Sequence, residues 1–193
     1  MGFQITGDPA ADAVLDEYPL ALAIGMQLDQ QYPIEHAFRG GWKILTRFGS
    51  LDTGDIAAAD PEAFKALCSQ APAIHRFPGA KAAAVQKLAA IVESDYDGDP
   101  ALIWTGARTG DELLTRLKAL PAFGPQTARI FVALLGKQLD VRPRGWKTAA
   151  GDYALAGHRS VADVTGPVAL QKVREYKKAA KAAAKAAAAE PAR

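Results

Sequence analysis

The stretch LPAFGPQTA, residues Leu120 to Ala128, joins two amphipathic segments and decides the fold. Pro121 cannot continue a helix, because it has no amide hydrogen and its ring clashes with the preceding turn. Gly124 can adopt a left-handed or tight conformation, and Pro125 suits the first turn of a new helix. The first amides of that helix have no internal partner, so the stretch predicts an anion-binding turn between two helices.

The segments on either side of this turn have the apolar spacing of helices. Thr109 and Glu112 form a capping-box pattern at the start of the first helix, and Gly136 can end the second. Residues 109–136 are therefore predicted to form a helix, a short loop and a helix. The apolar positions are Leu113, Leu117 and Leu120 in the first segment, and Thr127, Ile130, Phe131, Leu134 and Leu135 in the second.

This unit resembles the helix-hairpin-helix motif of the HhH-GPD superfamily of base-excision DNA glycosylases, whose pattern is Leu-Pro-Gly-hydrophobic-Gly-x-x-Thr-Ala. Only Ala122 departs from the pattern, since the family usually has glycine there. Three further stretches resemble the family in the same order, over roughly residues 15–146. They are MQLDQQ at 26–31, the segment 48–64, and GAKAAAVQKL at 79–88.

The rest of the chain predicts an all-α protein, because strand-like runs are few and alanine is abundant. The resemblance implies two helical lobes with a cleft between them, formed by residues 1–170 and carrying the hairpin motif at 109–136. Residues 171–193 form a basic, Lys/Ala-rich C-terminal helix or tail. Further helices are predicted at 8–15, 19–31, 34–48, 61–68, 79–94 and 167–188, with a loop at 151–156.

Charge is distributed unevenly along the 193 residues, whose formal net charge is +2. The segment 172–193 has seven basic and two acidic residues, a net of +5, so residues 1–171 carry −3. DNA affinity of the folded part must therefore come from a local patch and from backbone amides. For the tail, two interpretations stay open: a basic arm that slides on DNA, or a solubilising end.

Cys68 is the single cysteine, which excludes a disulfide within the chain and a four-cysteine iron–sulfur cluster. It is predicted to be a buried, inert thiol. The apolar run 19–26 is too short to span a bilayer and does not resemble a signal peptide, so a cytoplasmic, nucleoid-associated monomer is expected. The three histidines have no metal-ligand spacing, so no metal site is expected.

The resemblance also implies a mechanism. Such enzymes extrude a nucleotide into a pocket, and a carboxylate stabilises the positive charge that develops on the sugar. The corresponding position falls among residues 143–146, which contain no acid. The candidates are therefore Asp140 and Asp152, on either side of it, and Asp29 near the pocket. Each of the three can also be read as an ordinary solvated or helix-end acid.

Members of the family that cleave the strand have a lysine where this chain has Gln126. Without an amine there is no Schiff base, so a monofunctional enzyme that leaves an abasic site is expected. No cofactor is expected, although the family hairpin often holds a monovalent cation through carbonyls, here those of Leu120 and Phe123.

The candidate DNA contacts come from three places along the chain. Gln30 and Gln31 can fill the gap left by a flipped base, and Arg76 and Lys81 can meet phosphates. Tyr32, Trp42 and Trp146 are candidates for the base pocket, with core packing as the alternative for each. The hairpin contributes Phe123, Gly124, Gln126 and Thr127.

Three functions are consistent with this pattern. The first is a monofunctional DNA glycosylase that hydrolyses the bond between the sugar and a damaged or mismatched base in double-stranded DNA. The second is a noncatalytic helix-hairpin-helix protein that binds damaged or structured DNA, which the missing carboxylate favours. The third is a helical interaction module without DNA affinity.

Overall fold

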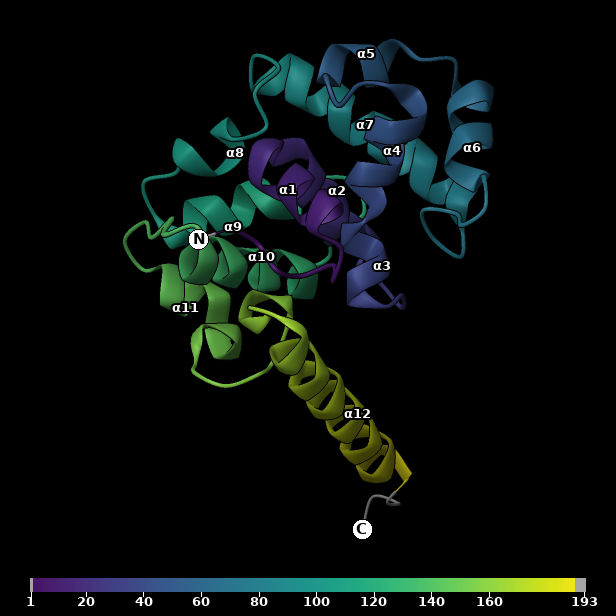
Figure 1. Cartoon of the computed structure of the whole chain (residues 1–193). Coiled ribbons are helices and arrows are strands. Elements are labelled where there is room, and N and C mark those ends of the chain that lie inside the picture. The colour runs from purple at the N-terminus through teal and green to yellow at the C-terminus, as the bar shows by residue number, and fades with distance from the viewer. Residues whose placement is uncertain (1, 190–193) are drawn as a thin grey trace.

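The computed structural model describes residues 2–189, and within that range the chain is built from helices alone, without a β-strand (Figure 1). The predicted all-α class is therefore confirmed. In chain order the helices are α1 (Pro9–Glu17), α2 (Pro19–Leu28), α3 (Ile34–Phe38), α4 (Gly40–Phe48), α5 (Thr53–Ala58), α6 (Pro61–Ser69), α7 (Pro78–Asp95), α8 (Leu102–Thr105), α9 (Gly110–Lys118), α10 (Pro125–Gln138), α11 (Trp146–Ala150), the 3-10 helices η1 (Gly151–Ala154) and η2 (Val161–Asp163), and α12 (Pro167–Ala189).

Side-chain caps set several helix starts where the sequence predicted them. Asp8 accepts a hydrogen bond from the amide of Ala10, and Asp60 accepts one from Ala63. Thr109 accepts from the amide of Glu112, whose own carboxylate accepts from the amide of Arg108 rather than from that of Thr109. Thr109 and Glu112 therefore each accept a hydrogen bond from a backbone amide at the start of α9, an arrangement close to the capping box that the sequence predicted.

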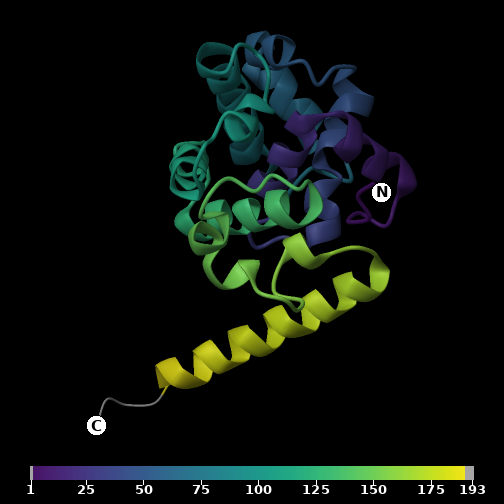
Figure 2. The same cartoon turned by 90° about the vertical axis from the view of Figure 1, so that its left-hand side faces the viewer.

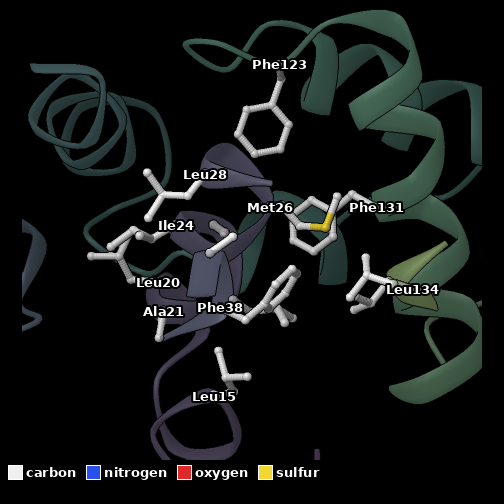
Figure 3. Packing of buried hydrophobic residues seen from close by; sticks show 14 of the residues in the cluster. Leu15, Leu20, Ala21, Ile24, Met26, Leu28, Phe38, Phe123, Phe131 and Leu134 are labelled. Carbon is white, nitrogen blue, oxygen red and sulfur yellow. The ribbon is translucent and has the colours of Figure 1, made fainter. Parts of the chain in front are cut away.

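Helix α2 lies at the centre of the molecule, because it is apolar all round. It contacts α1, α3 and α4 as well as α7 and α10. Its residues 20–28 are all buried, and Met26 lies close to Phe131 of α10 (Figure 3). Helices α5 and α6 pack on α7 on one side of α2, while α9, α11, η1 and η2 pack on α10 on the other (Figure 1).

The single helix predicted over residues 34–48 is wrong, because the chain breaks at Arg39 into α3 and α4. The two glycines of α4 do not interrupt the helix; close packing requires them. A Cβ on Gly41 would lie 2.6 Å from the Cβ of Ala21, and one on Gly40 would overlap the side chain of Leu28. The two glycines therefore let α4 approach α2 closely.

Helix α12 begins at Pro167 and runs through the expected domain boundary at residue 170. Its first turns pack Leu170 and Val173 into the core. Two ion pairs follow, Arg174 with Glu35 and Lys177 with Asp29. From residue 178 to 187 every described residue is exposed, and this half extends beyond the body of the molecule (Figures 1 and 2).

Two smaller sequence predictions, for residues 151–156 and for Cys68, can be compared with the structure. Residues 151–154, predicted as loop, form the 3-10 helix η1. Cys68 is fully buried, as predicted. Among residues 2–189 no helix combines the length and the apolar character needed to cross a bilayer, and no three His, Cys, Asp or Glu side chains converge as metal ligands.

Candidate functional site

The hairpin between α9 and α10 has its left-handed residue at Ala122, where φ is +62°. The prediction that Gly124 supplies this conformation is wrong, since Gly124 is extended, with φ −77° and ψ 171°. A left-handed alanine costs roughly 1–2 kcal/mol because its Cβ crowds the following carbonyl oxygen. Ala122, where the family usually has glycine, is therefore the hairpin residue whose backbone conformation favours glycine.

Gly124 has no packing neighbour. A Cβ built on it would meet no atom within 4 Å, and its extended backbone is open to any residue. Neither the fold nor the turn therefore requires glycine at this position. Because Gly124 has no side chain, no atoms project from the hairpin surface at the start of α10.

The first turn of α10 presents bare amides to solvent. No side chain caps the helix, and Pro125 has no N–H. The part of the chain that the structure describes offers no acceptor to the amides of Gly124, Gln126 and Thr127. Gly124, Pro125 and Gln126 are exposed. This helix end therefore has the geometry and the partial positive charge of an anion site.

Phe123 is buried beneath this turn and packs on Phe131, with ring centroids 6.1 Å apart (Figure 3). Its side chain was predicted as a DNA contact, but it anchors the loop in the core. Only the backbone of Phe123 can face a ligand.

A polar network ties the hairpin to the rest of the protein. Gln27 donates from Nε2 to the carbonyls of Ala84 at 3.0 Å and Pro121 at 2.8 Å. Lys81 donates from Nζ to the carbonyl of Gln27 and to Oε1 of Gln30, both at 2.9 Å. Gln30 in turn donates to the carbonyl of Ala122. We call this network the hairpin brace.

The brace corrects the role predicted for Lys81. Its side chain is buried, and burial lowers the pKa of its ammonium group. The ammonium group supports the hairpin from inside and does not meet a phosphate. Gln27 was missed by sequence reasoning, although it is the one polar residue that points into the core from the apolar helix α2. That contrast is the signal that could have found it.

Gln31, Arg76 and Phe77 form an exposed group near the brace. Arg76 donates to Oε1 of Gln31, and its guanidinium lies 4.6 Å from the centroid of the Phe77 ring. Phe77 is 57% exposed, which is unusual for an aromatic residue. Behind it, Tyr32 packs on the buried His75 with ring centroids 4.7 Å apart. We call Gln31, Arg76 and Phe77 the exposed wedge group.

A cavity of about 630 Å³ lies where the first turns of α10 meet η1 and α12. Its size is typical of pockets for small organic molecules, roughly 300–1,000 Å³. Gln126, at the start of α10, donates to the hydroxyl of Tyr153 at 2.9 Å. The cavity therefore adjoins the bare amides of the hairpin. Its other polar or charged lining residues are Arg129, Asp152, Arg159, Tyr176, Lys177 and Lys181.

The three candidate carboxylates lie in very different surroundings. Asp152 lines the cavity. The side chain of Asp29 is 5% exposed and lies 3.6 Å from Nζ of Lys177, a cavity residue. Burial raises the pKa of Asp29 to about 6, although the Lys177 ammonium lowers it. Asp140 lies beyond the far end of α10, is 80% exposed and pairs with Arg142. Asp140 is therefore excluded from the cavity.

Tyr32, Trp42 and Trp146 were predicted to form the base pocket, but none of the three lines the cavity. Trp146 packs against Gly136, where a Cβ would lie 2.5 Å from its ring. This contact accounts for glycine at position 136, and α10 continues past it to Gln138. Trp42 packs against the hydrophobic core.

The segment expected to carry the catalytic acid has another role. The carbonyl of Arg144 accepts from the amide of Gly110, and Gly145, with φ +82°, turns the chain into α11. Residues 143–146 therefore join α9 to α11 and bring no carboxylate to the cavity.

Sequence reasoning missed most of the cavity wall. Arg159, Tyr176 and Lys177 come from segments that matched no family motif. Arg159 reaches the cavity from the loop between η1 and η2, and the placement of α12 brings Tyr176 and Lys177 beside α10. The expected hairpin cation stays a prediction. The carbonyl of Leu120 already accepts from the amide of Phe123 at 3.2 Å, and the two glutamines of the brace occupy those of Pro121 and Ala122.

Comparison of the chain with protein-family models, curated proteins and solved structures returns no match.

Proposed function

We propose that this chain is a monofunctional DNA glycosylase, which takes a damaged or mismatched base from double-stranded DNA into the cavity beside α10. One observation carries the proposal: a cavity of about 630 Å³, large enough to admit a base, adjoins a bare, solvent-facing helix N-terminus. A strand held by phosphate at that terminus would place a neighbouring nucleotide at the cavity. The ordered resemblance to the HhH-GPD superfamily supports the same function.

The hairpin would hold the strand through the amides of Gly124, Gln126 and Thr127. A phosphate oxygen can accept two or three such hydrogen bonds and gains from the helix dipole. Gly124 lets the phosphate approach without steric conflict, which accounts for a glycine that the fold does not need.

The exposed wedge group would occupy the space that the flipped base leaves. Phe77 offers a flat apolar ring, and Gln31 offers an amide that can bond the orphaned partner base. Unstacking a base costs a few kcal/mol, and an inserted aromatic ring restores part of the lost stacking.

Asp152 is the proposed carboxylate, because of the three candidates it alone lines the cavity. As the N-glycosidic bond breaks, the electron pair leaves with the base and positive charge develops at C1′ of the sugar. The Asp152 carboxylate stabilises that charge and accepts the proton of the water that attacks C1′. Gln126 has no amine, so the product is an abasic site and the strand is not cleaved.

The grouping of helices on either side of α2 supports the two-lobed arrangement that the resemblance implies, with α2 and the brace between the lobes. DNA repair also implies the nucleoid as the place of action and double-stranded DNA as the partner.

The test is a panel of duplexes carrying uracil, hypoxanthine, alkylated adenine or 8-oxoguanine, each treated with excess protein and then with alkali to cleave abasic sites. We expect product from at least one duplex, loss of at least about 100-fold in rate for Asp152→Asn, and little change for Asp140→Asn. Absence of product from every duplex would refute the enzymatic proposal.

A second function is a noncatalytic protein that binds damaged DNA. The absence of an acid among residues 143–146 favours it. It predicts tight binding of lesion duplexes without base release, and equal binding by the wild type and the Asp152→Asn variant.

A further inference from the structure

The walls of the cavity carry an excess of positive charge. Arg129, Arg159, Lys177 and Lys181 line it, against the single carboxylate of Asp152. Two further acids lie next to lining residues: Asp29 is 3.6 Å from Nζ of Lys177, and Asp163 accepts from the amide of Arg159. Even when both are counted, the four cations outnumber the three carboxylates. This charge bears on which base the cavity can accept.

Tyr176, one of the two tyrosines that line the cavity, is already engaged by a cation of the protein. The guanidinium of Arg159 lies 5.7 Å from the centroid of the Tyr176 ring, and its Nη1 donates to the Tyr176 hydroxyl at 3.1 Å. The hydroxyl of Tyr153 accepts from Gln126. A cationic ligand is usually held over free aromatic faces or beside carboxylates. Here a cation of the protein already lies over the Tyr176 ring.

The polar groups of the cavity are mainly hydrogen-bond donors. Nε of Arg159 is buried and has no acceptor within residues 2–189. The guanidinium of Arg129 is on the exposed rim, above Gly151. The arginine and lysine groups that line the cavity can donate hydrogen bonds but cannot accept them, which favours a ligand that brings acceptors, such as an exocyclic carbonyl oxygen.

We propose that the cavity selects uncharged bases that carry carbonyl oxygens, namely deaminated or oxidised bases, and discriminates against cationic N-alkylated purines. This inference rests on the proposed function, because it assumes that the cavity receives a flipped base. It adds a substrate class that is set by charge: a base with a fixed positive charge meets four cationic side chains and a single carboxylate among the residues that line the cavity.

The test compares two purines of similar size and different charge, 8-oxoguanine and 7-methylguanine, each opposite cytosine. Both carry 2′-fluoroarabinose, which blocks hydrolysis, so the readout is equilibrium binding measured by fluorescence anisotropy. We expect the 8-oxoguanine duplex to bind at least about tenfold more tightly, once each affinity is divided by that of the matching undamaged duplex. Equal affinities, or tighter binding of 7-methylguanine, would overturn the inference.

Variants separate charge selection from general DNA attraction. Arg129→Gln and Arg159→Gln each remove one cavity cation, and we expect each to reduce the ratio of the two affinities about twofold to threefold. Lys185→Gln is the control, since Lys185 is on the exposed half of α12 outside the cavity. It should weaken both duplexes equally. If both arginine variants also leave the ratio unchanged, the inference is refuted.

The binding readout does not need base release. If no duplex of the glycosylase panel yields product while the binding preference holds, catalysis fails and charge selection stands. If base release occurs with a preference for cationic bases, the glycosylase proposal stands and charge selection fails.

Discussion

Replacing Gly124 by alanine separates the hairpin's proposed role in DNA binding from its role in folding. The added methyl group meets no protein atom within 4 Å, and the extended backbone at this position suits alanine. Such a substitution stabilises a protein by about 0.4–1 kcal/mol, because the unfolded chain has fewer conformations to lose. For a chain of this size that corresponds to a rise in Tm of about 1–4 °C.

DNA affinity should change in the opposite direction. The methyl group occupies the space through which a phosphate would reach the amides of Gly124, Gln126 and Thr127. Loss of one amide hydrogen bond to a charged oxygen costs about 1.5–3 kcal/mol, so we expect binding to weaken about 10-fold to 150-fold. The predicted variant is more stable than the wild type and binds DNA less well.

The assay is thermal unfolding together with anisotropy titration of a duplex that contains an abasic site. Gly49→Ala is the matched control, since the space around Gly49 is equally open but its φ is +88°. That variant should lose about 1–2 kcal/mol of stability and keep its DNA affinity. Unchanged affinity in Gly124→Ala would show that no phosphate approaches the turn, and the proposed binding mode would be wrong.

Three further outcomes follow from the structure. Ala122→Gly removes a left-handed alanine, and after the entropy cost of glycine is subtracted it should raise the free energy of unfolding by about 0.5–1 kcal/mol. The measurement is urea unfolding, and a lower free energy of unfolding would show that the backbone at Ala122 is not strained. The raised pKa of Asp29 means that the folded chain binds its proton more tightly than the unfolded chain, so this carboxyl lowers stability as pH rises from about 4 to about 6. Asp29→Asn should therefore be more stable than the wild type by about 2–3 kcal/mol at pH 7 and equal to it at pH 4, and a less stable variant at pH 7 would disprove this. Burial raises the pKa of the Cys68 thiol to about 12, so iodoacetamide at pH 8 should alkylate it only after unfolding, and rapid labelling of the native protein would be inconsistent with the structure.

The helices could be predicted from the sequence wherever a local signal decides them. Thr109 and Pro125 mark the starts of α9 and α10 because capping and proline geometry act within one turn of the chain. The break at Arg39 and the continuation of α10 past Gly136 could not be predicted. The glycines near these points suggested weak or terminal positions, but in the structure they allow close contacts with Ala21, Leu28 and Trp146, which a local signal does not reveal.

The site was predicted only in part, for the same reason. Gln126 lines the cavity and Gly124 presents an open surface, both on the hairpin that the motif identified. Lys81 and Phe123 were placed at the surface from the motif alone, but their neighbours bury them. The basic character of α12 was visible in the sequence, but the position of Lys177 and Lys181 beside the cavity was not, because it depends on how the first turns of α12 pack on the body of the protein.

The hairpin brace has a consequence for the order of events during base extrusion. Gln30 donates to the carbonyl of Ala122 and accepts from Nζ of Lys81, so both ends of its side-chain amide are engaged in the brace. The neighbouring Gln31 is exposed and bonds Arg76 outside the brace. If Gln31 enters the duplex, the hairpin loop therefore keeps its supports, and the protein can hold the DNA backbone while it tests a base pair.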